Sequence, residues 1–478
     1  MSTHGRPARD EQGRPARDEH GRPARDEQGQ GRPAGDEQGR PTGGGGRRTA
    51  RVERALRAAP AYALPEVLAA TLSREYPAVS AARLLVCDYH SRALMAVAPL
   101  LALPHPDSLA LTVPDGDVAA AEEVAEDIAE AIGIRQSPAG RSFVNGRVVS
   151  SSEGDGAGAG ETTTYIPVRA RGERIGVLEI GSSAPWSADE VGELAEIGEL
   201  VGSALKVAWN RTDRYERARR RHRLTLAAEL QWQLLPGHAH ADDSFSLAGH
   251  LEPAYSIGGD NFDWSVEHDH LALTVTNGSG TGISAALLTS LTVGALRNAR
   301  RSGADLGEQA SLANDMVHVR HGGREFTETL VMRIDLAEGV VHVIDAGSPR
   351  ILLLRGAEVT AVPLEQQMPL GMFPDTEYRP QRFSLEPGDR LVIVSDGVFA
   401  ARAPAGEYGT HQLEQATRRS RLQPAAEVPL TVIDELIEFH EGDDLADDAV
   451  VVCFDWHRPP GGASPVPPHV ALHGESAV

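Results

Sequence analysis

The chain has 478 residues, of which 41% are hydrophobic and 24% are charged, and its formal net charge is −22 at pH 7. This length allows two or three globular domains. The negative charge argues against nucleic acid as a partner, because phosphate binding requires a clustered positive field.

Low-complexity sequence opens the chain. The octad Gly-Arg-Pro-Ala-Arg-Asp-Glu-Gln starts at Gly5, Gly13 and Gly21, with His20 in place of the last Gln in the second copy. It has no large apolar side chain, so stacked copies would bury nothing, and we expect residues 1–48 to be disordered. Two interpretations are open: an electrostatic tether, or a low-complexity tail with no specific role. The Pro- and Gly-rich residues 458–478 are also predicted to be disordered.

The sequence shows no targeting or membrane signal. Its charged, Gly-rich start is not typical of a signal peptide, and no apolar run reaches the roughly 18 residues that cross a bilayer. Cys87 and Cys453 lie in apolar, strand-like runs, which favours buried free thiols. We therefore expect a cytoplasmic protein with no membrane partner.

Residues 51–208 have the pattern of an α/β domain. Two strand patterns within 162–180 are joined by a turn near Arg171 and Gly172. A capping-box pattern at residues 187–190 then begins an Ala- and Leu-rich helix. With the motif Gly-Val-Leu-Glu-Ile before it, this stretch resembles a GAF sensor domain. The resemblance implies an unknown small-molecule ligand; a structural dimerisation domain is the alternative.

A long linker helix is predicted to follow, over residues 209–236. Apolar side chains recur at helical spacing before it, and a basic run continues to Pro236. This pattern suggests a helix that pairs with its copy in a homodimer. For the arginines, a solvated basic face is the simpler interpretation. The apolar residues of the stripe are Leu194, Ile197, Val201, Leu205 and Ala208.

Residues 240–457 are dominated by short strand patterns, interrupted by a few long helices. Such an order favours an α+β sandwich covered by helices. We predict strands at 245–251, 271–276, 329–336, 340–345, 351–355, 390–395 and 450–455, and helices at 283–303, 306–319 and 427–440.

A Gly-rich turn stands between a strand and a helix of this region. The run Asn-Gly-Ser-Gly-Thr-Gly at 277–282 superficially matches a phosphate-binding turn. A dinucleotide site also needs a parallel strand–helix–strand unit with an acidic residue about 20 residues on. The next predicted strand begins only near Thr329, which argues against that interpretation.

Three aspartates lie on turns beside apolar strands. Asp260 stands in Gly-Gly-Asp-Asn-Phe-Asp, Asp396 follows the run Leu-Val-Ile-Val-Ser, and Asp447 precedes Val-Val-Val-Cys-Phe. Alone, each is more typical of a turn residue or a helix cap. Together at one sheet edge, they could hold hard divalent cations through oxygen.

Taken in order, these motifs resemble the metal-dependent PPM-type protein phosphatases, in particular the bacterial stage II sporulation protein E branch. The resemblance covers about residues 220–456. It rests on Leu-Ala-Ala-Glu-Leu-Gln-Trp-Gln-Leu-Leu-Pro at 226–236, Gly-Gly-Asp-Asn-Phe-Asp at 258–263, Gly-Thr-Gly-Ile-Ser-Ala-Ala at 280–286, Asp-Ala-Gly-Ser-Pro at 345–349, Pro-Leu-Gly at 369–371, Pro-Gly-Asp at 387–389, Ser-Asp-Gly-Val at 395–398 and Asp-Asp at 447–448.

The resemblance implies a PPM-phosphatase β-sandwich and two Mn²⁺ or Mg²⁺ ions that activate a water against a phosphoserine or phosphothreonine. The implied metal ligands are Asp260, Asp396, Asp447 and the backbone carbonyl of Gly278. Asn277 occupies the position of the aspartate that normally bridges both ions. An amide carries no net charge and bridges poorly, so we expect at least one metal site to be weakened.

Two function hypotheses follow. The first is a protein serine/threonine phosphatase that acts on a phosphorylated regulatory protein, such as an anti-anti-sigma factor, and is gated by the sensor domain. The alternative is a catalytically impaired pseudophosphatase that serves as a regulatory binding module, because Asn277 replaces the bridging aspartate.

Overall fold

The computed structural model describes residues 45–98, 131–152, 162–220, 225–254, 258–347, 349–403, 406–441 and 445–457. All of them belong to one compact unit, Gly43–Val478. The predicted disordered tails lie outside these ranges, apart from residues 45–48, which begin the first helix. Both cysteines are buried free thiols, as predicted. None of the helices within these ranges is long and apolar enough to span a bilayer.

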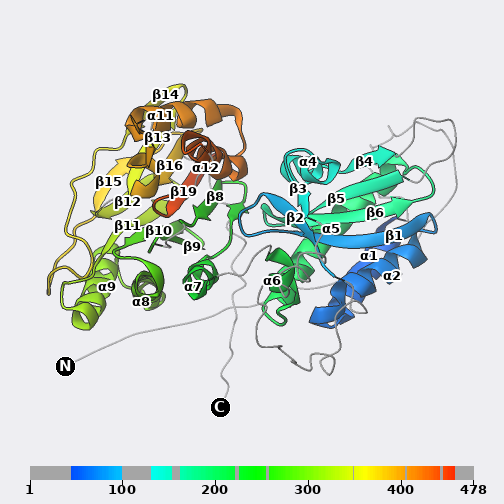
Figure 1. Ribbon diagram of the computed structural model, residues 1–478, viewed down its shortest axis with the longest axis horizontal. Helices are drawn as coiled ribbons and strands as arrows, with labels where there is room; N and C mark the ends of the chain where they lie inside the picture. Colours follow the sequence, from blue (N-terminus) through cyan, green and yellow to red (C-terminus); the bar gives the residue numbers. More distant parts are fainter. Residues whose placement is uncertain are drawn as a thin grey trace, which may run out of the picture. The chain divides into compact units, whose positions relative to one another are not determined.

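The N-terminal domain is built on one antiparallel sheet with the strand order β3-β2-β1-β6-β5-β4 (Figure 1). One face packs on α1, α2 and α5, and the other face packs on α4. The elements are α1 (Gly45–Ala58), η1 (Ala61–Ala63), α2 (Leu64–Glu75), β1 (Val79–Cys87), β2 (Ala93–Ala96), β3 (Ala131–Gly133), α4 (Pro138–Asn145), β4 (Val149–Ser152), β5 (Thr162–Ala170), β6 (Glu173–Ser182) and α5 (Ala188–Trp209).

Helix α5 confirms one part of the sequence prediction and corrects another. It begins with the predicted capping box, in which Ser187 and Glu190 satisfy each other's backbone groups. Its apolar stripe, however, is buried in the core of its own domain, where Leu194, Ile197 and Val201 pack with strand residues of the sheet. The prediction that this stripe forms a dimer interface is therefore wrong, because the stripe is buried by packing within its own domain.

The predicted continuous linker helix is also wrong. The chain forms α6 (Arg214–Arg219) and α7 (Leu226–Leu234) as separate short helices after α5. The break has a tertiary cause: Arg214 is buried and donates hydrogen bonds to Glu66 and to the carbonyls of Tyr62 and Ala98. This anchoring draws α6 against the N-terminal domain and overrides the helical spacing of the sequence.

The C-terminal domain is a sandwich of two antiparallel sheets, which confirms the predicted α+β architecture (Figure 1). Their inner faces share one apolar core. Helices α8 and α9 cover the outer face of the sheet β15-β12-β11-β10-β9, and α11 and α12 cover the outer face of the sheet β14-β13-β16-β19-β8-β7.

The described elements of this domain follow the predicted strands and helices closely and add several short ones. They are β7 (Ala239–Ala241), β8 (Phe245–Glu252), β9 (Asn261–Val266), β10 (His270–Gly278), α8 (Gly282–Arg301), α9 (Leu306–His321), β11 (Thr327–Asp335), β12 (Val340–Ala346), β13 (Arg350–Arg355), β14 (Glu358–Ala361), β15 (Gln381–Ser384), β16 (Arg390–Val394), α10 (Asp396–Phe399), β17 (Arg402–Ala403), β18 (Gly406–Glu407), α11 (Gly409–Arg419), η4 (Ser420–Leu422), η5 (Ala425–Glu427), α12 (Val428–Phe439) and β19 (Ala449–Trp456).

Strand register brings four chain segments to the same end of the sandwich. In one sheet, Thr276 near the end of β10 pairs with Asn261 at the start of β9. In the other sheet, Val394 at the end of β16 pairs with Val451 near the start of β19. The residues that follow β10 and β16, and those that precede β9 and β19, are therefore the natural place for a shared site.

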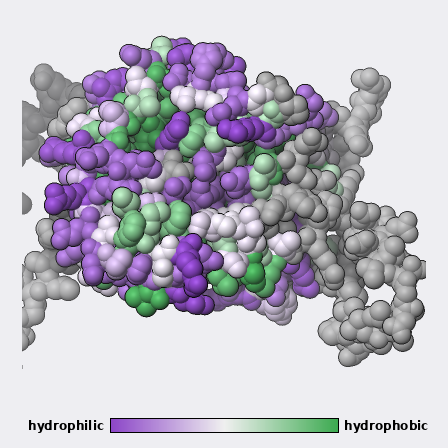
Figure 2. Space-filling model, turned by 60° about the vertical axis from the view of Figure 1, so that its left-hand side comes forward, coloured by the Kyte–Doolittle hydropathy of each residue, from purple (hydrophilic) through white to green (hydrophobic). Residues whose placement is uncertain are grey.

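The surface of the face shown in Figure 2 is largely hydrophilic. Apolar side chains gather there in several small, separate areas. Such scattered exposure is normal for a protein surface.

The role of Arg214 can be tested by stability. We expect Arg214→Ala to lower the free energy of unfolding by about 2 kcal/mol, because it removes a buried guanidinium that donates to the half-buried Glu66 carboxylate and to two backbone carbonyls. The matched control is Arg217→Ala, an exposed position on the same helix, which should change stability by less than about 0.5 kcal/mol. Urea denaturation followed by circular dichroism measures both. Equal stability of the two variants would contradict this account of the helix break.

Candidate metal centre

The predicted site residues come together at this end of the sandwich. Asn277 at the end of β10 donates a hydrogen bond from Nδ2 to Oδ1 of Asp396, at 2.6 Å. Asp396 is the first residue of α10, and the N-cap Ser395 joins it directly to the end of β16. A side chain at Gly258 would lie 2.9 Å from Oδ1 of Asp447, so the segment before β9 passes directly beside that carboxylate.

Glycine is required where the segments before β9 and after β10 meet. A Cβ atom on Gly259 would lie 2.5 Å from the carbonyl oxygen of Gly278. The Gly278 amide donates to the Gly259 carbonyl at 3.0 Å, and the Thr289 hydroxyl donates to the same carbonyl at 2.6 Å. The predicted carbonyl ligand, Gly278, is thus fixed beside the carboxylate group.

The carboxylates form an electrostatically costly group. Asp260 is buried, and burial together with the charges of Asp448, Asp396 and Asp447 raises its pKa well above the usual range. Burial and the charge of Asp396 raise the pKa of Asp447 to about 6. Like charges this close disfavour simultaneous ionisation, and a bound dication would reverse these shifts.

The donor set fits a hard divalent cation. All donors are carboxylate, amide or carbonyl oxygens, which Mg²⁺ and Mn²⁺ prefer. In the described part of the chain, Oδ2 of Asp260 is buried without a hydrogen-bond partner, as expected for an oxygen that awaits a cation. Over the same ranges, no three His, Cys, Asp or Glu side chains already converge closely enough to hold an ion.

Asn277 changes the local chemistry in a specific way. An aspartate at this position would face Asp396 as a like charge, and a cation between them would be needed to relieve the repulsion. The amide instead makes a charge-assisted hydrogen bond with Asp396, which is attractive without any cation. Asn277 therefore lowers the electrostatic demand for an ion on this side of the group.

Two residues that the sequence analysis did not assign to the site complete it. Asp448 is fully buried; its Oδ1 accepts from the backbone amide of Ala254 at 2.8 Å. Its Oδ2 accepts from Nε2 of Gln231 at 2.6 Å. The Gln231 amide also donates to the carbonyls of Gly258 and Asp260. Helix α7 is thereby tied to the loops that carry the carboxylates.

A sequence signal for Gln231 exists. Ala227, Ala228 and Gln231 lie at helical spacing on the buried face of α7, so Gln231 is a polar residue at a position where the pattern calls for an apolar one. A buried polar side chain must find hydrogen-bond partners, and such a break in the pattern marks a structural or functional contact.

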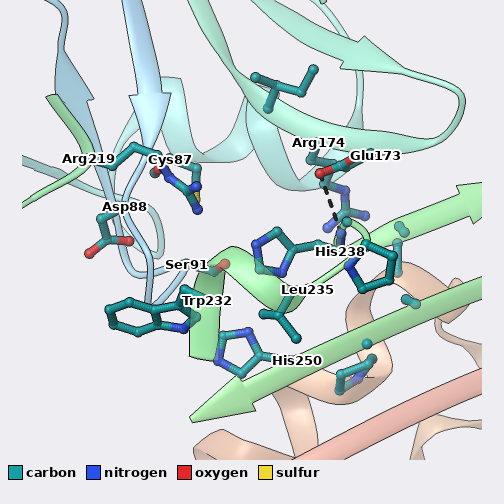
Figure 3. A pocket seen from close by; sticks show the side chains of 18 of the residues that line it. Cys87, Asp88, Ser91, Glu173, Arg174, Arg219, Trp232, Leu235, His238 and His250 are labelled. Atoms are coloured by element: carbon teal, nitrogen blue, oxygen red, sulfur yellow. Dashed lines mark hydrogen bonds between the residues drawn. The ribbon is translucent and has the colours of Figure 1, made fainter. Parts of the chain in front are cut away.

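A separate cavity of about 490 Å³ lies away from the carboxylates, and none of the predicted metal ligands lines it. Its walls come from the N-terminal domain, the linker helices and the C-terminal domain; Figure 3 shows Asp88, Arg219, Trp232, His238 and His250 around it. Two cations of its wall form ion pairs, Lys206 with Glu173 and Arg174 with Glu427. The cavity volume suits a small molecule.

Comparison with known proteins gives consistent matches to one group. Residues 267–457 match the family described as Stage II sporulation protein E (SpoIIE), a range that contains all the predicted metal ligands except Asp260. Protein IcfG of Synechocystis sp. is 23% identical over 300 residues, which are 55% of this chain and 46% of that protein. This chain thus spans about half the length of that relative.

Phosphoserine phosphatase RsbU of Bacillus subtilis is 20% identical over 243 residues, which are 51% of this chain and 72% of that protein. Among solved structures, the RsbU and RsbW domains of Rv1364c from Mycobacterium tuberculosis are 22% identical, with a TM-score of 0.41 over 45% of this chain and 61% of that chain.

The contact between α7 and the carboxylate group can be tested by mutation. We expect Gln231→Ala to destabilise the protein by about 2 kcal/mol, because it leaves the Asp448 carboxylate short of a buried donor. Gln233→Ala on the same helix removes an exposed amide that donates to Glu229, and it should cost less than about 0.5 kcal/mol. Thermal unfolding of both variants measures the difference. Equal melting temperatures would show that the Gln231 contact does not contribute to stability.

Proposed function

We propose that this chain, whose residues 267–457 belong to the stage II sporulation protein E family of PPM-type phosphatase domains, is a metal-dependent protein serine/threonine phosphatase. The observation that carries the proposal is the buried Oδ2 of Asp260, which lies beside Asp396 and Asp447 and has no hydrogen-bond partner among the described residues. Acidic groups are brought together at such cost where a cation neutralises them.

The residues have distinct roles in this proposal. Asp260, Asp396, Asp447 and the Gly278 carbonyl would hold Mn²⁺ or Mg²⁺, with the Asn277 amide as a weak additional donor. The bound metal would supply a water of lowered pKa as nucleophile, so no side chain of the protein has to attack phosphorus. The chain itself contributes a rigid arrangement, because Gln231 and Ala254 fix Asp448 beside the ligands.

A phosphorylated regulatory protein is the proposed substrate, of the anti-anti-sigma type. The match to RsbU, a protein named as a phosphoserine phosphatase, supports this choice. Two apolar side chains on the first turns of α8, Ile283 and Leu287, are 46% and 55% exposed directly after the Gly-rich turn. Exposed apolar side chains beside a site favour contact with a protein over a small phosphoester.

The N-terminal domain is proposed to be a GAF-like sensor that gates the phosphatase domain. Its single antiparallel sheet with helices on both faces supports this assignment. The 490 Å³ cavity is the proposed place for a small-molecule ligand. Homodimerisation would have to use exposed apolar side chains such as Val207 and Leu226, because the stripe on α5 is buried.

The alternative is a pseudophosphatase that binds a regulatory protein without turnover. One observation favours it: the hydrogen bond from Asn277 to Asp396 satisfies a ligand carboxylate without metal. A missing charge about 4 Å from a dication costs several kcal/mol even at an effective dielectric near 20. Metal affinity decides between the two functions.

The first experiment measures phosphate release from a phosphoserine protein of this regulatory class across a Mn²⁺ titration. We expect activity that requires millimolar Mn²⁺, is removed by EDTA, and falls at least about 100-fold in Asp396→Ala. Asp345→Asn is the control, since that aspartate lies in the same domain and bonds the Gly347 amide outside the carboxylate group. No turnover at any Mn²⁺ concentration would favour the binding module.

Restoring a negative charge at position 277 tests whether the remaining ligands are still arranged to bind metal. We expect Asn277→Asp to tighten Mn²⁺ binding by on the order of 100-fold in calorimetry and to raise the number of bound ions. Asn277→Ala serves as the control, because it removes the amide without adding charge. Unchanged metal binding in Asn277→Asp would mean that the remaining ligands are not arranged around a cation.

A further inference from the structure

The turn between β1 and β2 of the N-terminal domain contacts the C-terminal domain at two places. Tyr89 stacks on Trp232 of α7, with ring centroids 4.3 Å apart and an interplanar angle of 12°. Arg92 donates to Oε1 of Glu252 at 2.9 Å, and Nδ1 of His90 lies 3.3 Å from the same oxygen. Glu252 is the last residue of β8 and is buried.

This turn is preformed. The buried carboxylate of Asp88 accepts hydrogen bonds from the backbone amides of Arg92 and Ala93, at 2.8 and 3.1 Å. Ser91 adopts a left-handed conformation with φ of 56° within the loop that these bonds close. Arg219 holds Tyr89 from the linker, with its guanidinium 4.2 Å from the ring centroid. The turn therefore presents Tyr89 and Arg92 at low entropic cost.

Both contacted elements lead to the same buried carboxylate. On α7, the residue before Trp232 is Gln231, which donates to Oδ2 of Asp448. Just after β8, Ala254 lies two residues beyond Glu252 and donates to Oδ1 of Asp448. Glu252 also pairs across the sheet with Ala449, the residue after Asp448.

From this convergence we propose that the turn 88–92 is a two-point clamp by which the N-terminal domain holds Asp448, and with it the adjoining candidate metal ligands, in place. When the turn is docked, α7 and the segment just after β8 supply two of the donors to Asp448, the Gln231 side chain and the Ala254 amide. When it is released, α7 loses the stacking partner of Trp232, and Glu252 loses the charge of Arg92. The clamp regulates the site assigned above, so its biological consequence rests on the proposed function.

The cavity gives the clamp a place where a ligand could act. Asp88, Ser91, Trp232 and His250 all belong to its wall, so a molecule there would touch the base of the turn and the partner of its aromatic contact (Figure 3). His250 also lies 3.1 Å from Oε2 of Glu252. Occupancy would shift the clamp only by the difference in affinity for its docked and released states.

Hydrogen exchange of the full chain without metal or substrate tests the clamp. We expect Tyr89→Ala/Arg92→Ala to speed amide exchange about tenfold in peptides covering α7 and residues 445–450, while β5 and α5 keep wild-type protection. The control is Arg83→Ala, which removes an ion pair with Glu179 inside the same domain and should leave those peptides unchanged. Arg92→Ala alone leaves the aromatic stack intact and should give an increase of about threefold.

Two outcomes would overturn the clamp. One is wild-type exchange over α7 and residues 445–450 in the double variant; the other is an equal increase in Arg83→Ala, which would indicate general loosening. Because this readout needs no turnover, a failed phosphatase assay with the expected exchange pattern would reject catalysis and leave the clamp standing. The reverse pattern would reject the clamp alone.

Discussion

The arrangement around the candidate metal centre depends on how the buried carboxylate of Asp448 is satisfied. A carboxylate removed from water is very costly unless hydrogen bonds replace its solvation. Here the side chain of Gln231 and the backbone amide of Ala254 supply two of them, and the backbone of Gly258 and Asp260 supplies others. Two of the donors come from α7 and from the segment just after β8, so parts of the chain that are far apart in sequence both contribute to the satisfaction of Asp448.

This constraint links stability to the site. Asp447, the neighbour of Asp448, faces Asp396, and both contribute to the raised pKa of Asp260. A movement of α7 that breaks the Gln231 hydrogen bond removes one donor from Asp448 and disfavours its charged form. The same helix carries Trp232, which stacks on Tyr89 of the N-terminal domain. Packing outside the site and electrostatics inside it are therefore coupled through one short helix.

Sequence patterns predicted most of this framework. Alternating apolar residues and turn motifs placed β8, β10 and β19 correctly, because these strands are buried and their pattern is local. The order of the motifs also predicted that Asp260, Asp396 and Asp447 share one site. The strand register explains why they lie at the same end of the sandwich. These features depend on neighbours in the chain or on motifs that are themselves short.

The failures share a different cause. The linker was expected to be one helix, but the buried contacts of Arg214 with the N-terminal domain break it. The apolar stripe on α5 had the spacing of a dimer seam, yet the same spacing serves packing on a sheet. The local sequence does not reveal that Arg214 bonds Glu66 or that Gln231 bonds Asp448. In each pair the partner lies more than 140 residues away in sequence. Long-range polar contacts produce no periodic pattern in the sequence around either residue.

The substitution at Asn277 gains a sharper meaning from this geometry. A bridging aspartate would make the apo site repel itself, so metal binding and ordering of the site would be one event. With the amide, Asp396 is held by a neutral donor whether or not a cation is present. The ordering of the site then falls to the docking of α7 and β8 on Asp448. Under the proposed function, Asn277 would therefore shift control of the site from the metal toward the contacts that α7 and the segment after β8 make with Asp448.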